Sequence, residues 1–209
     1  MDSIDAAELI AELHEDKAEQ AEADRFRNRA ALLIAVLAAI LAIGGLGGGN
    51  ATDDLIGYNI RASDTWAFFQ AKNVRQTMYE LAVEDLEASL PTLSPVERAS
   101  AERRIAEYEA TIHRYDSEPD PEAPNDPLKG EGKKELTAQA KSFEAGRERA
   151  AAQDDNFDLA EVALQLALVL GSVAILAVNR MILIMSLGLG LIGTFLTLNG
   201  FFLFMALPV

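Results

Sequence analysis

The sequence predicts an all-α integral membrane protein with three transmembrane helices and an extramembrane antiparallel helical bundle that resembles a coiled coil. Half of the 209 residues are hydrophobic, yet 24% are charged and the formal net charge is −15. The apolar residues concentrate in 28–49 and 159–209, and the charges lie almost everywhere else. A soluble fold would mix the two kinds at helical or strand spacing. This segregation is typical of membrane spans joined to a polar domain.

Residues 30–49 form the first predicted span. The stretch AALLIAVLAAILAIGGLGG carries no charge and is long enough to cross a hydrocarbon core of roughly 30 Å. It is preceded by a long polar segment, residues 1–29, which argues against a signal peptide. That segment is predicted to be an acidic amphipathic helix whose apolar stripe contains Ile4, Ala7, Ile10 and Leu13. The glycines at 44–49 suggest a frayed helix end or a hinge.

The C-terminal apolar tract is too long for one crossing, so it must fold back. Asn179 and Arg180 are the polar place to do so, which predicts spans at 159–178 and 181–206. Alternatively, Arg180 is a functional charge inside the membrane, but its candidate partner Glu161 lies at the far end of the second span. We therefore interpret Arg180 as a turn residue.

Basic residues near the span ends predict the orientation. Arg25, Arg27 and Arg29 precede the first span, and two further crossings return Arg180 to the same side. These four topology determinants predict a multi-pass protein of the bacterial inner membrane with a cytoplasmic N-terminus. Residues 50–158 and the C-terminus are then periplasmic.

Each predicted span has a face of small residues at steps of three and four. Lipid tails are as apolar as leucine, so close backbone approach across small residues is what holds helices together in lipid. These faces predict packing within one chain or between copies. In the first span they are Ala31, Ala35, Ala38, Ala42, Gly45 and Gly49, in the second Ala160, Ala163, Ala167, Gly171 and Ala174, and in the third Ser186, Gly190, Thr194 and Thr197.

The polar residues of the third span leave an alternative open. Ser186, Thr194, Thr197 and Asn199 would suit the lining of a water-filled path. Pore linings usually add charged rings or discontinuous helices, and neither is evident here. Packing is the favoured interpretation.

The predicted outer domain, residues 50–158, consists of helices. One is expected to begin at a cap at Ser63 or Asp64 and to end near Leu90, and SPVE (94–97) is a capping box that opens a second. A third is expected at 135–153, after a Pro-rich, extended or mobile linker at 116–134. Every-fourth-residue apolar positions in the first helix are Val74, Met78, Ala82, Leu86 and Leu90, and a heptad-like seam in the second holds Ala101, Ile105, Tyr108, Ile112 and Tyr115. The predicted core of this bundle comprises Trp66, Phe69, Met78, Leu86, Ile105, Tyr108 and Ile112.

No catalytic, cofactor-binding or metal-binding residue is predicted, and we expect the protein not to be an enzyme. The acidic balance argues against nucleic acid as a partner, and the chain has no Cys. Neither a nucleophile elbow nor a nucleotide-binding motif is present. The pairs Asp53-Asp54 and Asp154-Asp155 would suit a divalent cation, but acidic residues commonly mark span ends.

Two stretches, SDTWAFFQAKNVRQTMYEL and FDLAEVALQLALVLGSVAILAVNRMILI, resemble an uncharacterised bacterial family of small membrane proteins, a domain of unknown function. Its members are similar in having an N-terminal span, an S/N-D-x-W-x-x-[FY]-Q-A-K helix and two C-terminal spans. The resemblance covers roughly residues 25–201. Phe68 and Phe69 stand where aromatic residues, often Tyr, are expected. The resemblance supports the layout and implies no catalytic residues.

The predicted function is that of a non-enzymatic inner-membrane protein that self-assembles or serves as an accessory or scaffold subunit of a larger membrane complex. Its expected partners are the lipid bilayer and copies of itself or other membrane subunits. A channel or transporter component is one alternative. A membrane sensor that signals through the N-terminal helix is another.

Overall fold

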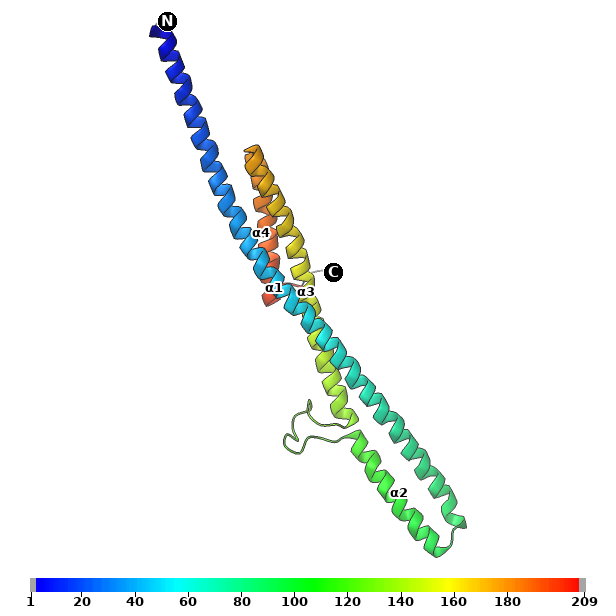
Figure 1. The fold of residues 1–209 in the computed structure, drawn as a ribbon. Helices are drawn as coiled ribbons and strands as arrows, with labels where there is room; N and C mark the ends of the chain where they lie inside the picture. Colours follow the sequence, from blue (N-terminus) through cyan, green and yellow to red (C-terminus); the bar gives the residue numbers. More distant parts are fainter. Residues whose placement is uncertain (1–2, 207–209) are drawn as a thin grey trace. The chain divides into compact units, whose positions relative to one another are not determined.

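The computed structural model describes residues 3–206, and it describes side chains for residues 13, 14 and 16–206. Four α-helices follow one another: α1 (Ser3–Ser89), α2 (Pro95–Asp116), α3 (Lys133–Ala177) and α4 (Arg180–Phe202) (Figure 1). A single 3-10 turn, η1 (Leu90–Thr92), connects α1 to α2. The helices α1, α3 and α4 each contain a segment long and apolar enough to cross a membrane. The chain divides into a first unit, residues 1–52 with 150–209, and a second unit, residues 53–149.

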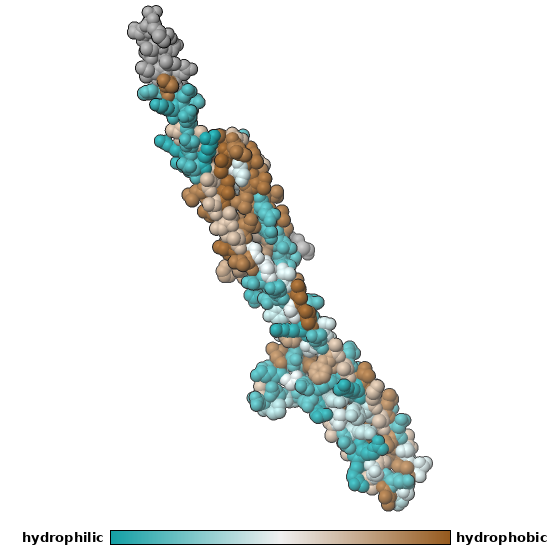
Figure 2. Space-filling model, viewed as in Figure 1, coloured by the Kyte–Doolittle hydropathy of each residue, from teal (hydrophilic) through white to brown (hydrophobic). Residues whose placement is uncertain are grey.

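The first unit is three helical segments packed together: the beginning of α1, the end of α3 and all of α4 (Figure 1). Its core is apolar, and Leu37, Leu164 and Ala167 are buried at the centre. Figure 2 shows hydrophobic residues gathered over this unit, whereas both kinds are mixed over the second. The outward-facing apolar surface of the first unit matches what lipid, and not water, would solvate.

The predicted turn at Asn179 and Arg180, between α3 and α4, is confirmed. The helix α3 ends at Ala177 and α4 begins at Arg180. Val178 takes a left-handed conformation (φ 47°), and the Asn179 side chain accepts hydrogen bonds from the N–H groups of Met181 (2.9 Å) and Ile182 (3.3 Å). Arg180 forms an ion pair with Glu22 of α1, and not with the Glu161 of the alternative interpretation.

The helix α1 is continuous, which corrects two predictions. It does not end at 44–49, and no new helix starts at Ser63 or Asp64. The segment contains no proline, so every residue can donate to the helical ladder. The hydroxyl of Thr65 bonds to the carbonyl of Arg61, one turn back in the same helix (2.7 Å).

In the second unit, two successive stretches of α1 pack against two different helices, first α3 and then α2. Up to Asn73, α1 lies beside the start of α3: the indole of Trp66 donates to Glu144 (2.8 Å), and Lys133 reaches Asn73 (3.3 Å). Beyond that point it lies beside α2, where the rings of Tyr79 and Tyr108 are 5.1 Å apart. The predicted capping box at the start of α2 is present. In the second unit, α1 therefore packs antiparallel against the start of α3 and, further along its length, against α2.

Met78 does not lie in the core of this unit. Its side chain is 64% exposed, and Val74 is 52% exposed. Within this unit the buried positions of α1 are instead Ala62, Lys72, Gln76 and Val83. Met78 is one residue from the half-buried Tyr79, a rotation of about 100° around the helix. Of the other predicted core residues, Ile105 is buried, and Trp66, Phe69, Leu86, Tyr108 and Ile112 are half-buried.

Candidate functional site

The small residues predicted in α3 and α4 lie inside the first unit. Their backbones approach neighbouring side chains so closely that even a methyl group would collide. A Cβ at Gly171 would lie 2.8 Å from Ile34, and one at Gly190 would lie 2.7 Å from Leu37. Among the predicted packing positions, Ala163, Ala167, Gly171, Ala174, Ser186, Gly190 and Thr197 are buried and Thr194 is half-buried.

The glycine-rich stretch of α1 forms a seat for the Phe157 ring. A Cβ on Gly47 would lie 2.6 Å from this ring, and one on Gly200 of α4 would lie 2.8 Å from it. The ring also meets Phe201 edge to face, with centroids 4.9 Å apart. These glycines therefore serve close approach between α1, α3 and α4 rather than flexibility.

The polar side chains of α4 form hydrogen bonds within the first unit. Ser186 donates to the carbonyl of Ala167 (2.6 Å), and Thr197 donates to that of Gly193 in its own helix (2.9 Å). Asn199 donates to the side-chain oxygen of Asn156 (2.7 Å). Asn199 also closes the end of α4, because it exchanges hydrogen bonds with the backbone of Met205 (2.8 and 2.9 Å). These contacts support packing more than a polar lining.

The predicted small-residue face of α1 is not used within the chain. Four buried positions of this stretch recur every seven residues, at Ala30, Leu37, Gly44 and Ala51, and Gly47 is buried as well. No atom lies within 4 Å of a Cβ added at Gly45 or Gly49. We call this surface the outer α1 face. Its residues are exposed in the single chain: Ala31, Ala35, Ala38, Ala42, Gly45 and Gly49.

The other exposed surfaces of the first unit carry large side chains. On α1 itself, Leu32, Val36 and Ile43 lie on a different side of the helix from the outer α1 face. Large, branched side chains are what acyl chains solvate well, whereas a strip of alanine and glycine leaves a shallow channel that fits a second helix. The exposed large residues of α3 and α4 include Val162, Leu166, Val169, Val173, Met181, Met185, Leu191, Phe195 and Leu198.

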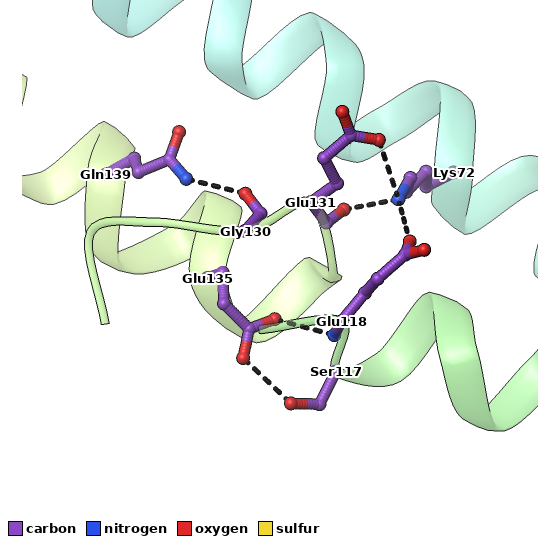
Figure 3. Close-up of polar contacts among 7 residues, drawn as sticks. All are labelled: Lys72, Ser117, Glu118, Gly130, Glu131, Glu135 and Gln139. Atoms are coloured by element: carbon purple, nitrogen blue, oxygen red, sulfur yellow. Dashed lines mark hydrogen bonds and ion pairs between the residues drawn. The ribbon is translucent and has the colours of Figure 1, made fainter. Parts of the chain in front are cut away.

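In the second unit, Lys72 joins three segments. Its side chain is only 6% exposed. The ammonium group lies 3.1 Å from the carboxylate of Glu118 and donates to the backbone carbonyl of Glu131 (Figure 3). It also lies over the rings of Phe68 (5.3 Å) and Tyr115 (5.5 Å). A buried cation needs such partners to offset its lost hydration, so Lys72 fixes the loop after α2 onto α1.

Glu135 holds the same loop from the side of α3. Its carboxylate accepts from the hydroxyl of Ser117 (2.7 Å) and from the N–H of Glu118 (3.1 Å) (Figure 3). Burial by itself raises the pKa of Glu135, but these hydrogen bonds and the nearby Lys134 charge outweigh it, so the pKa lies below its usual value. The pKa of Asp116 is lowered too, first by a hydrogen bond from Gln76 and then by Lys133.

The segment 117–132 is more folded than its proline content suggests. Pro119 and Gly130 form an isolated antiparallel bridge, the N–H of Glu131 donates to the carbonyl of Glu118 (2.9 Å), and Gly130 takes a positive φ of 109°. The loop borders an open groove of about 690 Å³ that also includes Asp64, Phe68 and Gln139. Within the residues that the structure describes, no three His, Cys, Asp or Glu side chains are grouped as metal ligands.

Sequence reasoning missed the role of Lys72, although it lies in the DTWAFFQAK stretch that stood out. Trp66 and Phe69 of the same stretch pack edge to face at 5.5 Å. The family model of a domain of unknown function, DUF4337, matches residues 26–203. The chain belongs to this family. A comparison with curated proteins finds no match, and neither does one with solved structures. Membership in the DUF4337 family carries no assigned activity, so function must be argued from the surfaces described above.

Proposed function

We propose that this DUF4337 protein is a non-enzymatic protein of the bacterial inner membrane that assembles through the outer α1 face. The face receives the same face of a second copy or, in an accessory role, a span of another membrane protein. The second unit then lies on the periplasmic side, and the N-terminus is cytoplasmic.

The single observation that carries this proposal is the contrast between the packed and unpacked small residues. Those of α3 and α4 are buried, apart from the half-buried Thr194, whereas all six residues of the outer α1 face are exposed. Small residues give helix association in lipid by allowing backbones to approach, with no hydrophobic force between the helices. On α1, the exposed strip of small residues lies next to large exposed side chains. Another helix is therefore expected to dock on the side that carries the small residues.

Cysteine crosslinking in native membranes tests self-assembly directly, since the natural chain has no Cys. Ala38→Cys and Ala42→Cys are expected to give disulfide-linked dimers under mild oxidation, because Cα atoms of facing small residues can come within about 6 Å. Val36→Cys and Ile43→Cys are the matched controls, on the side with large residues. Equal crosslinking of both sets, or none from the outer α1 face, would contradict self-assembly through this surface.

A photoreactive residue at position 38 separates the two forms of the proposal. Crosslinks to a second copy indicate self-assembly. Crosslinks to a different polypeptide, with no dimer, indicate an accessory subunit. Crosslinks to lipid alone would contradict both forms.

Orientation has its own test. Asp120→Cys, in the loop of the second unit, is expected to react with a membrane-impermeant maleimide added to spheroplasts. Labelling only after the inner membrane is opened would reverse the proposed topology. Positive charges flanking the spans set the expected result.

A further inference from the structure

A groove of about 730 Å³ lies between α1 and the start of α4 in the first unit. Its lining combines positive charge with apolar surface. The charged residues are Arg25, Arg29 and Arg180, with Glu22 as the one carboxylate, and the apolar ones are Ala18, Ala21, Phe26, Leu183 and Ile184.

The positive charge of this groove is only partly matched. Glu22 pairs with Arg180. The neighbouring Asp24 does not line the groove, and its carboxylate is 3.3 Å from Arg27. Within the part of the chain that the structure describes, neither Arg25 nor Arg29 has a carboxylate at ion-pair distance. These two arginines are four residues apart, so they point to one side of α1.

The apolar lining continues from the arginines along α4. Ile184 is exposed, and Leu183 and Phe26 are half-buried. The groove lies beside the first turns of α4, where this apolar helix begins. It also lies next to the point where α1 changes from a charged to an apolar sequence. A ligand that fits here has an anionic head with hydrogen-bond acceptors and an apolar tail. Guanidinium groups bind phosphate oxygens through two parallel N–H bonds, which suits a phosphodiester.

We propose that this groove binds the headgroup phosphate of an anionic phospholipid. Arg25 and Arg29 hold the phosphate, and the acyl chains follow Leu183 and Ile184. Glu22 competes with the lipid for Arg180. Basic pockets beside membrane spans on the cytoplasmic side are suited to such headgroups. The inference rests on the membrane location in the proposed function, but it requires neither self-assembly nor a particular copy number.

Native mass spectrometry of the full chain in detergent tests the site with phosphatidylglycerol as the probe. Phosphatidylethanolamine, which has no net charge, is the reference lipid. The double variant Arg25→Gln/Arg29→Gln is expected to weaken phosphatidylglycerol retention about 25-fold, taking about fivefold for each arginine near a lipid surface. Arg27→Gln removes one arginine charge on the same helix outside the groove, as each single substitution of the double variant does inside it, and is expected to leave retention unchanged.

Glu22→Gln provides a test that loss of folding cannot imitate. It removes the competing carboxylate, so phosphatidylglycerol retention is expected to rise about fivefold. Equal losses in Arg27→Gln and in the double variant, or no gain from Glu22→Gln, would overturn the site. Equally tight binding of glycerol 3-phosphate, which lacks acyl chains, would overturn the lipid as occupant and assign a soluble phosphate.

The same spectra test the lipid site and self-assembly separately, so that one can fail while the other holds. Monomers that retain phosphatidylglycerol selectively would contradict self-assembly and support the lipid site. Oligomers that show no preference for phosphatidylglycerol over phosphatidylethanolamine would do the reverse.

Discussion

The two units are built on the same helix but are held together by different chemistry. In the first, Leu37 of α1 belongs to the apolar core with Leu164 and Ala167, and Gly47 packs against the Phe157 ring. In the second, α1 presents Lys72 and Gln76, and the contacts are ion pairs and hydrogen bonds. Both seams repeat at about seven residues, as in packed helices generally. The spacing therefore indicates that α1 packs in both units, and the buried residues differ: Leu37 is among those of the first unit, whereas those of the second include Lys72 and Gln76.

The largest effect is expected from filling a close contact in the first unit. Gly193→Leu places a side chain where even a Cβ lies 2.6 Å from Leu164 and 3.1 Å from the carbonyl of Ala160. Overpacking of this kind should cost about 3 kcal/mol. The measurement is thermal unfolding in detergent, with hydrogen exchange to locate the loss in α3 and α4.

Gly45→Leu is the matched control, because no atom lies within 4 Å of a Cβ there. It should leave the unfolding of the single chain unchanged while it abolishes crosslinking at Ala38→Cys. Equal destabilisation by both substitutions would show that the two glycine positions do not differ as described.

The second largest effect should come from Lys72→Met, which keeps the apolar stem and removes the charge. The carbonyl of Glu131 and the carboxylate of Glu118 then lose their donor. We expect a loss of about 2 kcal/mol, confined to the second unit. Faster proteolysis within 117–132, with unchanged exchange in α4, is the expected readout. The exposed Lys141→Met should change stability by less than about 0.5 kcal/mol.

A smaller effect is expected from the polar pair in the first unit. Asn199→Leu removes the 2.7 Å hydrogen bond to Asn156 and the closure onto Met205, and it should cost about 1 kcal/mol, since hydrogen bonds between helices in lipid are modest. Thr194→Val should cost less, because that hydroxyl bonds only to a carbonyl of its own helix. A larger loss for Thr194→Val would contradict this ranking of the two polar groups.

The smallest effect should be a pH dependence of the second unit. Glu135 and Asp116 have pKa values lowered by folding, so their stabilisation is full above the usual values of 4.5 and 3.8 and is lost as the pH falls through the lowered ones. Opening of 117–132 should therefore increase at acidic pH, by about 0.5 kcal/mol for Glu135. Hydrogen exchange at pH 3 and pH 6 measures it, and Glu135→Gln should reduce the difference.

Much of the fold could be predicted because it depends on local signals. Length and hydropathy located the apolar segments, the polar pair Asn179-Arg180 within an apolar tract located the turn, and Ser94 with Glu97 located the start of α2. The small residues of α3 and α4 were found for the same reason, since helical spacing in a neutral segment leaves few other uses for them.

The missed features all depend on partners distant in sequence. The glycines at 44–49 looked like a hinge because nothing local shows that Phe157 packs against them. Met78 looked like core because hydrophobic spacing cannot show that Lys72 contacts the loop after α2 and that Gln76 contacts Asp116 at the end of α2. Buried charges are predictable only once their partners are known. The outer α1 face shows the same limit, since composition cannot distinguish a contact within the chain from one between chains.

The packing of Phe157 against the glycines of α1 also has a consequence for the synthesis of the protein. Gly47 leaves the ribosome long before Phe157 and Gly200, and a chain is synthesised from its N-terminus. In the nascent chain, the glycines of α1 around Gly47 therefore stay uncovered until translation is nearly complete. Chains that stop before Phe157 would lack the ring that covers Gly47 and would leave this glycine exposed.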